Sequence, residues 1–282
     1  MKLAFNLLLW TTHVTQEHFP LFAELKRSGY DGVEIPIFEG TPEHFRTVGS
    51  VAADQGLPVS AVTVLPDAEH NAASADPAAR AGALERMKWA IDCLQAANGT
   101  LLCGPFYQPL GEFTGEPPTS AERKGVVEVH KAAADYAAAA GIRLGVEPLN
   151  RFECHVLNTA ADGAELVRQV GKPNYGMLYD TFHANIEEKD PVGAIGRNLA
   201  EINHVHLAEN DRGTPGKGHV PWKETLRAFK QGGYDGWFAI EAFGRALPAL
   251  AAATRVWRDF FPNREEVYRH GHDFLRETWA RV

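Results

Sequence analysis

The strongest constraint on the fold is a regular alternation of short apolar runs with longer helical patterns. Glycine, proline and helix-capping residues separate the two kinds of segment, as in chains that alternate strands with helices. The runs that have the composition of buried strands are residues 2–9, 32–35, 59–65, 100–103, 142–147, 175–179, 202–207 and 237–240. The helical patterns cover residues 15–27, 41–56, 76–97, 119–141, 159–170, a short stretch after 190–191, 222–231, 247–260 and 263–280.

Eight strand–helix units in 282 residues are typical of a closed barrel of parallel strands. No proline- or serine-rich linker and no low-complexity tract divides the chain. We therefore predict an α/β protein with one domain, residues 1–282, folded as a (β/α)8 TIM barrel with an additional C-terminal helix. An open doubly wound sheet is the less favoured alternative, because no glycine-rich phosphate-binding turn follows the first strand.

Composition narrows the class of function. The chain has 28 lysines and arginines against 36 aspartates and glutamates, so its formal net charge is −8. This acidic balance argues against a nucleic-acid-binding or anionic membrane surface. The three cysteines show no CxxC spacing, and the N-terminal apolar run is too short to span a membrane. We expect a soluble cytoplasmic protein whose partners include neither nucleic acid nor membrane.

Four consecutive predicted strands end on residues that bind metals. Glu147 ends the fifth strand, Asp180 follows the sixth, His206 lies near the end of the seventh and Glu241 follows the eighth. Active sites of such barrels form where the carboxyl ends of neighbouring strands meet. Three carboxylates this close repel one another unless a cation or a proton neutralises them. Three carboxylates and one imidazole suit Mn²⁺, Co²⁺ or Mg²⁺ better than a cation that prefers thiolate ligands.

Each of these residues has a simpler interpretation when it is taken alone. A single acid at a strand end is commonly a loop cap or one half of an ion pair. His206 alone fits a hydrogen-bonded core histidine, since His204 lies two residues earlier on the same face of the strand. The conjunction of four ligand-type residues at four successive strand ends favours the metal site.

Four short runs in the chain carry more specific information. They are residues 147–153 (EPLNRFE), 180–188 (DTFHANIEE), 204–209 (HVHLAE) and 233–236 (GYDG). They resemble the ketose 3-epimerases, which act on D-tagatose, D-allulose (D-psicose) or L-ribulose and belong to the xylose isomerase-like barrel superfamily. The resemblance is strongest over about residues 145–260, and DTFHANIEE is its most specific part.

The resemblance implies an isomerase whose substrate is a small keto-sugar and whose cofactor is a divalent metal. The metal ligands of the family match the four strand-end residues named above. The resemblance also implies that Glu147 and Glu241 double as the acid/base pair. Glu153, His183 and Arg212 match the positions that contact the substrate in this family.

The expected epimerisation also follows a consistent chemical path when it is argued from the residues alone. Epimerisation beside a carbonyl removes a proton from one face of the carbon and returns it to the other. A metal that chelates the carbonyl and the neighbouring hydroxyl stabilises the cis-enediolate between the two steps. Glu147 and Glu241 end strands that two others separate, so they can flank a substrate and act in turn as base and acid. We predict C3 epimerisation of a free ketose.

Three other functions stay open on the sequence alone. Residues 104–111 and Asn6 depart from the expected sugar-lining residues, so the site also suits an isomerase, epimerase or dehydratase of a keto-inositol, a 3-keto-glycoside or a hydroxy-keto acid. An endonuclease-IV-like DNA repair enzyme shares the fold, but it needs more metal ligands and a basic groove. A non-catalytic sugar-binding barrel is disfavoured by the complete acid/base set.

Further expectations concern the surroundings of the site. Trp10, Phe106 and Tyr107 are candidates for the floor of a sugar pocket, with core packing as the alternative. Glu34, at the end of the second strand, is a candidate for a further polar contact. The glycine-rich residues 213–218 form either a mobile lid or a plain surface loop.

The C-terminal segment carries more aromatic residues than a solvated tail needs. These residues are Trp257, Phe260, Phe261, Tyr268, Phe274 and Trp279. Such a segment packs either across the barrel or onto a second subunit. We expect a homodimer or a homotetramer.

Overall fold

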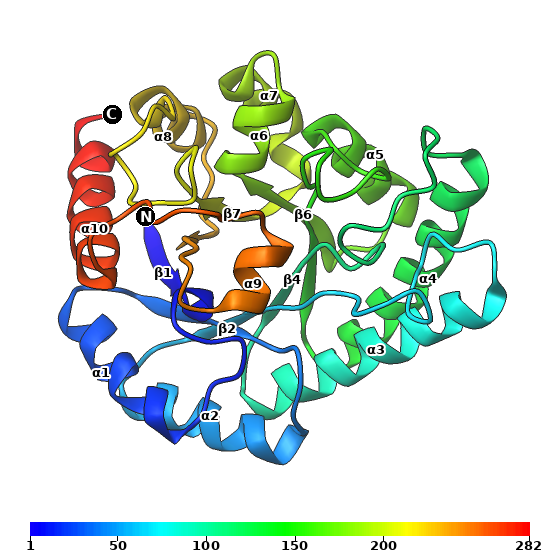
Figure 1. Cartoon of the computed structure of the whole chain (residues 1–282), viewed down its shortest axis with the longest axis horizontal. Coiled ribbons are helices and arrows are strands. Elements are labelled where there is room, and N and C mark those ends of the chain that lie inside the picture. Colours follow the sequence, from blue (N-terminus) through cyan, green and yellow to red (C-terminus); the bar gives the residue numbers. More distant parts are fainter.

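The computed structural model describes residues 1–282 and confirms the closed barrel (Figure 1). Each strand pairs in parallel with the next along the chain, and β8 pairs with β1 to close the ring. The strands are β1 (Lys2–Asn6), β2 (Gly32–Pro36), β3 (Val59–Val62), β4 (Leu101–Gly104), β5 (Arg143–Val146), β6 (Tyr175–Asp180), β7 (Ile202–Leu207) and β8 (Trp237–Ile240).

Helices surround the barrel and connect its strands (Figure 1). The α-helices are α1 (Phe19–Arg27), α2 (Pro42–Asp54), α3 (Pro77–Ala96), α4 (Ser120–Ala139), α5 (Ala160–Val170), α6 (Thr181–Glu187), α7 (Pro191–Asn198), α8 (Trp222–Gln231), α9 (Pro248–Ala253) and α10 (Arg264–Arg281). Short 3-10 turns lie at η1 (Leu7–Leu9), η2 (Gln16–His18) and η3 (Leu199–Glu201). None of the helices combines the length and the apolar composition that crossing a membrane requires.

Capping side chains explain where two of the long helices begin. Thr119 and Glu122 form a capping box at the start of α4, and Thr159 and Asp162 form another at the start of α5. Each box satisfies backbone N–H groups that have no partner within the helix. Gly171 then ends α5 in a left-handed conformation with φ 62°.

Several predicted boundaries are wrong. The first strand ends at Asn6 and not at residue 9, because the Asn6 side chain accepts a hydrogen bond from Leu8 N and starts η1. The third strand likewise ends at Val62, three residues early. The helix predicted over residues 247–260 is limited to α9, since Arg255 adopts a left-handed φ of 61° that no α-helix accommodates. Helix α6, directly after β6, has no counterpart in the predicted elements.

The C-terminal helix α10 packs against the start of the chain, where Figure 1 shows it beside β1. Arg276 Nη1 donates to Met1 O at 2.8 Å, and Tyr30 OH donates to Tyr268 O at 2.6 Å. The ring of Tyr268 also lies 5.9 Å from that of Trp10. Phe274 likewise packs on Trp222 and Trp279 on Phe238, so contacts with the rest of the barrel account for these three aromatic residues of the segment.

The inside of the barrel is partly polar. Asn6, Glu34, His204 and His206 are completely buried there, together with the thiol of Cys103. Buried polar groups are costly unless they are hydrogen-bonded. These side chains bond to one another below the carboxyl ends of the strands, and they position the site described next.

Candidate active site

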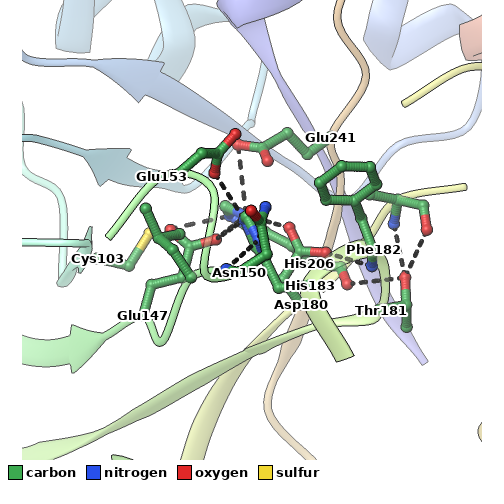
Figure 2. A network of polar contacts seen from close by, with 12 residues as sticks. Cys103, Glu147, Asn150, Glu153, Asp180, Thr181, Phe182, His183, His206 and Glu241 are labelled. Carbon is green, nitrogen blue, oxygen red and sulfur yellow. Dashed lines mark hydrogen bonds and ion pairs between the residues drawn. The ribbon is translucent and has the colours of Figure 1, made fainter. Parts of the chain in front are cut away.

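The structure brings the four strand-end residues together at the carboxyl rim of the barrel. Glu147 directly follows β5, Asp180 ends β6, His206 lies in β7 and Glu241 directly follows β8. All four side chains are buried, and one potential ligand atom from each lies within 4.8 Å of the others. Figure 2 shows the carboxylates of Glu147, Asp180 and Glu241 around the ring of His206.

Backbone pairing fixes the height of these residues in the barrel. Asp180 is the register partner of His206 on the neighbouring strand. Glu147 N donates to Gly104 O and Glu241 N donates to Leu207 O, so both acids continue the ladder by one residue. Alternate side chains of each strand point into the barrel. Because neighbouring parallel strands end at the same edge, their last inward side chains meet at the rim.

The ring of His206 is oriented toward the three acids. Its Nδ1 lies 3.4 Å from Glu241 Oε1, 3.7 Å from Glu147 Oε1 and 3.8 Å from Asp180 Oδ2, and it has no hydrogen-bond partner. Its Nε2 is 2.7 Å from Glu34 Oε1 on the opposite side of the ring. A buried nitrogen without a partner among three carboxylates fits a hard divalent cation, because such a cation takes oxygen and imidazole ligands.

The buried charges perturb one another. Burial raises the pKa of Glu147 well above its ordinary value, and the charges of Glu241 and Asp180 raise it further. Burial alone would lower the pKa of His206, but the charges of Glu241 and Glu34 outweigh it and raise that pKa well above its ordinary range. Without a cation the site therefore retains protons, and a bound cation would take their place.

Arg212 extends over the same acids. Its Nη1 donates to Asp180 Oδ2 at 2.9 Å and to Glu241 Oε2 at 2.7 Å. The guanidinium lies between two aromatic faces, 3.9 Å from the ring centre of Phe182 and 4.8 Å from that of Phe243. Arg212 has a left-handed φ of 66°, which is uncommon for a residue other than glycine and aims the side chain into the site.

His183 and Glu153 complete the group. His183 Nδ1 accepts a hydrogen bond from the backbone of Asn150 at 3.0 Å, and its Nε2 lies 2.8 Å from Arg212 Nη2. Glu153 Oε2 is 3.8 Å from His183 Nε2. Burial, with the charge of Arg212, lowers the pKa of His183 well below its ordinary value, so the imidazole is neutral. The three residues predicted as substrate contacts thus meet the four strand-end residues at one place.

Comparison with known proteins identifies the family. The family model for the xylose isomerase-like TIM barrel matches residues 22–278. The chain is 32% identical to a probable ketose 3-epimerase of Synechocystis sp., over 99% of this chain and 97% of that protein. The chain belongs to the ketose 3-epimerase family. It is therefore an enzyme of the isomerase class.

Further members of the family are similar to this chain along its whole length. A ketose 3-epimerase of Arthrobacter globiformis is 31% identical over 100% of this chain and 98% of that protein. A crystal structure of D-allulose 3-epimerase from Methylomonas sp., in complex with D-allulose, has a TM-score of 0.92 and 28% identity. It covers 99% of this chain and 97% of that one.

A cavity of about 710 Å³ opens beside the site of this epimerase-family enzyme. Glu153 and Phe182 line it, together with the exposed side chains of Phe113 and Phe152. The predicted aromatic floor is wrong for Phe106 and Tyr107, which are completely buried in the core. Trp10 packs against Phe5 and Tyr268 and does not line this cavity.

Two expectations about the surroundings are changed. Glu34 is a candidate for a further polar contact at the end of the second predicted strand, but it is fully buried below His206, where His204 and His206 donate to its carboxylate. The only sequence signal for this network is the His-x-His spacing of β7, which places both rings inside the barrel. The loop at residues 213–218 is attached to the barrel, because Glu209 accepts hydrogen bonds from Gly216 N, Val220 N and Trp222 Nε1.

Proposed function

We propose that the enzyme inverts C3 of a free ketose with the help of a divalent metal. The observation that carries this proposal is the convergence of three carboxylates on Nδ1 of His206, a buried nitrogen that has no other partner. The membership of the ketose 3-epimerase family supports the reaction class.

Glu147, Asp180, His206 and Glu241 are the proposed metal ligands. Mn²⁺ is the cation that we expect first, with Co²⁺ or Mg²⁺ as alternatives, because the set has three oxygen ligands and one imidazole. When bound, the cation would stabilise the negative charge that develops on the carbonyl oxygen of the substrate.

Glu147 and Glu241 are the proposed acid/base pair. Two strands, β6 and β7, separate the strands that they follow, so the two carboxylates approach the centre of the rim from different directions. One carboxylate removes the proton from C3, which gives a cis-enediolate of the substrate. The other returns a proton to the opposite face of C3. The configuration of the substrate at C3 decides which of the two acts as the base.

Glu153, His183 and Arg212 are proposed to hold the sugar hydroxyls. The guanidinium offers several N–H donors in one plane, while the carboxylate accepts hydrogen bonds from hydroxyl groups. All three side chains are buried at the same rim, and Glu153 also lines the adjoining cavity. This places donors and acceptors next to the proposed acid/base pair, as orientation of a ketose requires.

The test combines metal removal with conservative variants. Protein treated with a chelator should lose epimerase activity on a panel of ketoses, and added Mn²⁺ should restore it. Glu147→Gln and Glu241→Gln should each lose at least about two orders of magnitude in kcat, because an amide cannot transfer the proton. Glu85→Gln, at an exposed acid on α3, is the matched control and should behave like the wild type. Full activity after chelation, or in Glu241→Gln, would contradict the proposal.

The same assay separates the alternative substrates. Relatives of this chain are named as D-psicose and L-ribulose 3-epimerases, which favours free ketoses for this enzyme too. A keto-inositol, a 3-keto-glycoside and a hydroxy-keto acid should be included in the panel. A faster reaction on one of these than on any ketose would replace the proposed substrate class but keep the metal site.

We also propose that the enzyme is a homodimer or a homotetramer. Phe113 and Phe152 are 49% and 63% exposed beside the cavity, and Trp257 is 67% exposed. Large apolar side chains on the surface are typical of contacts between subunits. Sedimentation at micromolar concentration should give a multiple of the chain mass of 30.9 kDa, and a monomer would contradict this expectation.

A cytoplasmic location is proposed on chemical grounds. Cys93, Cys103 and Cys154 are all free and buried. Free thiols suit a reducing compartment. Fractionation of the source cells should recover the enzyme with the cytoplasm, and recovery with an extracellular or membrane fraction would contradict the proposal.

A further inference from the structure

A polar cluster lies inside the barrel, directly behind His206. Its centre is Glu34 on β2, whose side chain is completely buried. Asn6 on β1 and Ser60 on β3 are the register partners of Glu34, so the three side chains point into the same layer of the barrel. Glu34 takes no part in the proposed proton transfers, yet a carboxylate at this depth is costly unless it is fully paired.

Four hydrogen bonds from nitrogen and hydroxyl donors hold the Glu34 carboxylate, and the Cys103 thiol donates a fifth to Oε2 at 3.4 Å. Oε1 accepts from Asn6 Nδ2 at 3.0 Å and from His206 Nε2 at 2.7 Å. Oε2 accepts from Ser60 Oγ at 3.0 Å and from His204 Nε2 at 2.7 Å. An ionised carboxylate has no hydrogen to donate, so both Nε2 atoms must carry one.

The position of this hydrogen on the His206 ring decides whether Nδ1 has a lone pair with which to bind a metal. Nδ1 faces Glu147, Asp180 and Glu241 at 3.4 to 3.8 Å. These carboxylates attract a hydrogen onto Nδ1, and a hydrogen there removes the lone pair that a metal requires. In the cation-bound site the imidazole is neutral and carries only one hydrogen. Glu34 holds it on Nε2 and leaves Nδ1 as the nitrogen that faces the acids.

We propose that Glu34 is a positioning residue that fixes the Nε2–H tautomer of His206 and thereby sets the affinity of the site for its divalent cation. The inference rests on the metal site described under Proposed function and extends it to β2, which supplies none of the four ligands. A carboxylate behind a ligating imidazole also makes that imidazole a stronger donor. His204 serves to hold the second oxygen of Glu34, so that the carboxylate cannot rotate away from His206.

The same cluster offers a competing arrangement, a second cation site. Glu34, Cys103, His204 and His206 have potential ligand atoms within 4.8 Å of one another. However, the two 2.7 Å contacts of Glu34 are hydrogen bonds, and their hydrogens occupy the space between the atoms that would be ligands. The Cys103 thiol is also in contact with Glu34 Oε2 at 3.4 Å and with Ala61 O at 3.3 Å. The number of cations bound per chain separates the two arrangements.

Glu34→Gln tests the proposal with little change in shape. The amide keeps one acceptor oxygen, but its NH2 group faces an imidazole N–H that then has no acceptor. Mn²⁺ is titrated into chelator-treated wild-type and variant protein, and free Mn²⁺ is read by electron paramagnetic resonance. The variant should bind Mn²⁺ about 10- to 100-fold more weakly. Glu85→Gln, at an exposed acid on α3, is the matched control and should bind Mn²⁺ with the affinity of the wild type.

Nitrogen-15 NMR of the Mg²⁺-loaded wild type gives a readout that does not depend on a variant folding. The His206 ring should carry its hydrogen on Nε2 and none on Nδ1. A hydrogen on Nδ1, or equal Mn²⁺ affinity in Glu34→Gln, would overturn the proposal. Two bound cations per chain, one of which is lost in Cys103→Ser, would overturn it in favour of the second site. If the wild type binds no cation, that result contradicts the proposed metal-dependent function itself and, with it, the role of Glu34.

Discussion

At the scale of single residues, the site concentrates buried charge that has to be balanced. Arg212 neutralises Asp180 and Glu241 through one nitrogen, at 2.9 and 2.7 Å. Its neighbour His183 stays neutral, because burial and the guanidinium lower its pKa. Removing one member of such a group leaves an unpaired charge without access to water, which is among the most costly changes in a folded protein.

Arg212→Ala should therefore destabilise the metal-free protein by about 3–5 kcal/mol, since two buried acids lose their partner. Urea unfolding in the presence of a chelator measures this loss, and added Mn²⁺ should recover part of it. Arg197→Ala breaks a surface pair with Asp190 and should leave the unfolding midpoint nearly unchanged. Equal effects of the two substitutions would contradict the balance described here.

Glu153 provides a prediction that depends on pH. Burial raises its pKa to about 7 in the folded protein, from an ordinary value of 4.5. Between these values the folded state holds a proton that the unfolded chain has lost, so stability falls as the pH rises. The free energy of unfolding of the wild type, relative to Glu153→Gln, should fall by up to about 3 kcal/mol between pH 4.5 and 7 in the presence of a chelator. A difference that is independent of pH would contradict the buried carboxyl.

The rim residues could be predicted from the sequence, whereas the cluster behind them could not. Glu147, Asp180 and Glu241 each stand where an apolar run ends, and parallel strands bring such ends together. Glu34 instead meets His204 across the barrel, 170 residues away along the chain. No local pattern encodes which side chains face each other across a closed ring.

At the scale of elements, close approach between helices restricts particular positions. Gly49 lies in α2, where an added Cβ would be 2.4 Å from Ala97 O at the end of α3. Gly196 lies in α7, where an added Cβ would meet no atom within 4 Å. The two glycines share a helical setting but differ in the space around them.

Gly49→Ala should destabilise the protein by about 1–3 kcal/mol, because the backbone of the neighbouring helix has to shift. Gly196→Ala should stabilise it by about 0.5–1 kcal/mol, because alanine loses less conformational entropy in a helix. Thermal unfolding of both variants measures the difference. A stabilising Gly49→Ala would show that α2 and α3 do not approach so closely.

Element boundaries show where local signals mislead. The aromatic and apolar residues after 247 predict a helix to residue 260, but α9 ends at Ala253. Val256 leaves the helix and packs in a small buried cluster with Leu8 and Phe243, so tertiary contacts decide the path of the chain. Helix α6 is absent from the predicted elements because Asp180 is both the last residue of β6 and the N-cap of α6, with no turn residues between the two.

At the scale of the whole molecule, closure of the barrel makes distant segments interdependent. β1 completes the ring by pairing with β8, and α10 packs on the first residues of the chain. A cut between any two strands would leave open edges on a sheet that is otherwise closed. This supports the prediction that residues 1–282 form one domain.

Unfolding in urea, with a chelator present, should accordingly follow a single transition. Far-ultraviolet circular dichroism and tryptophan fluorescence should give coincident curves, since the barrel and its helices lose structure together. Clearly separated transitions would contradict the single-domain prediction.

The proposed mechanism depends on a cation-dependent proton transfer at C3. The most direct measurement is NMR of a ketose substrate in D2O, with chelator-treated enzyme and with the same enzyme reloaded with Mn²⁺. The proposed mechanism predicts deuterium at C3 together with the C3 epimer, both only after Mn²⁺ is added. Exchange at another carbon, or equal exchange by the chelator-treated enzyme, would contradict it.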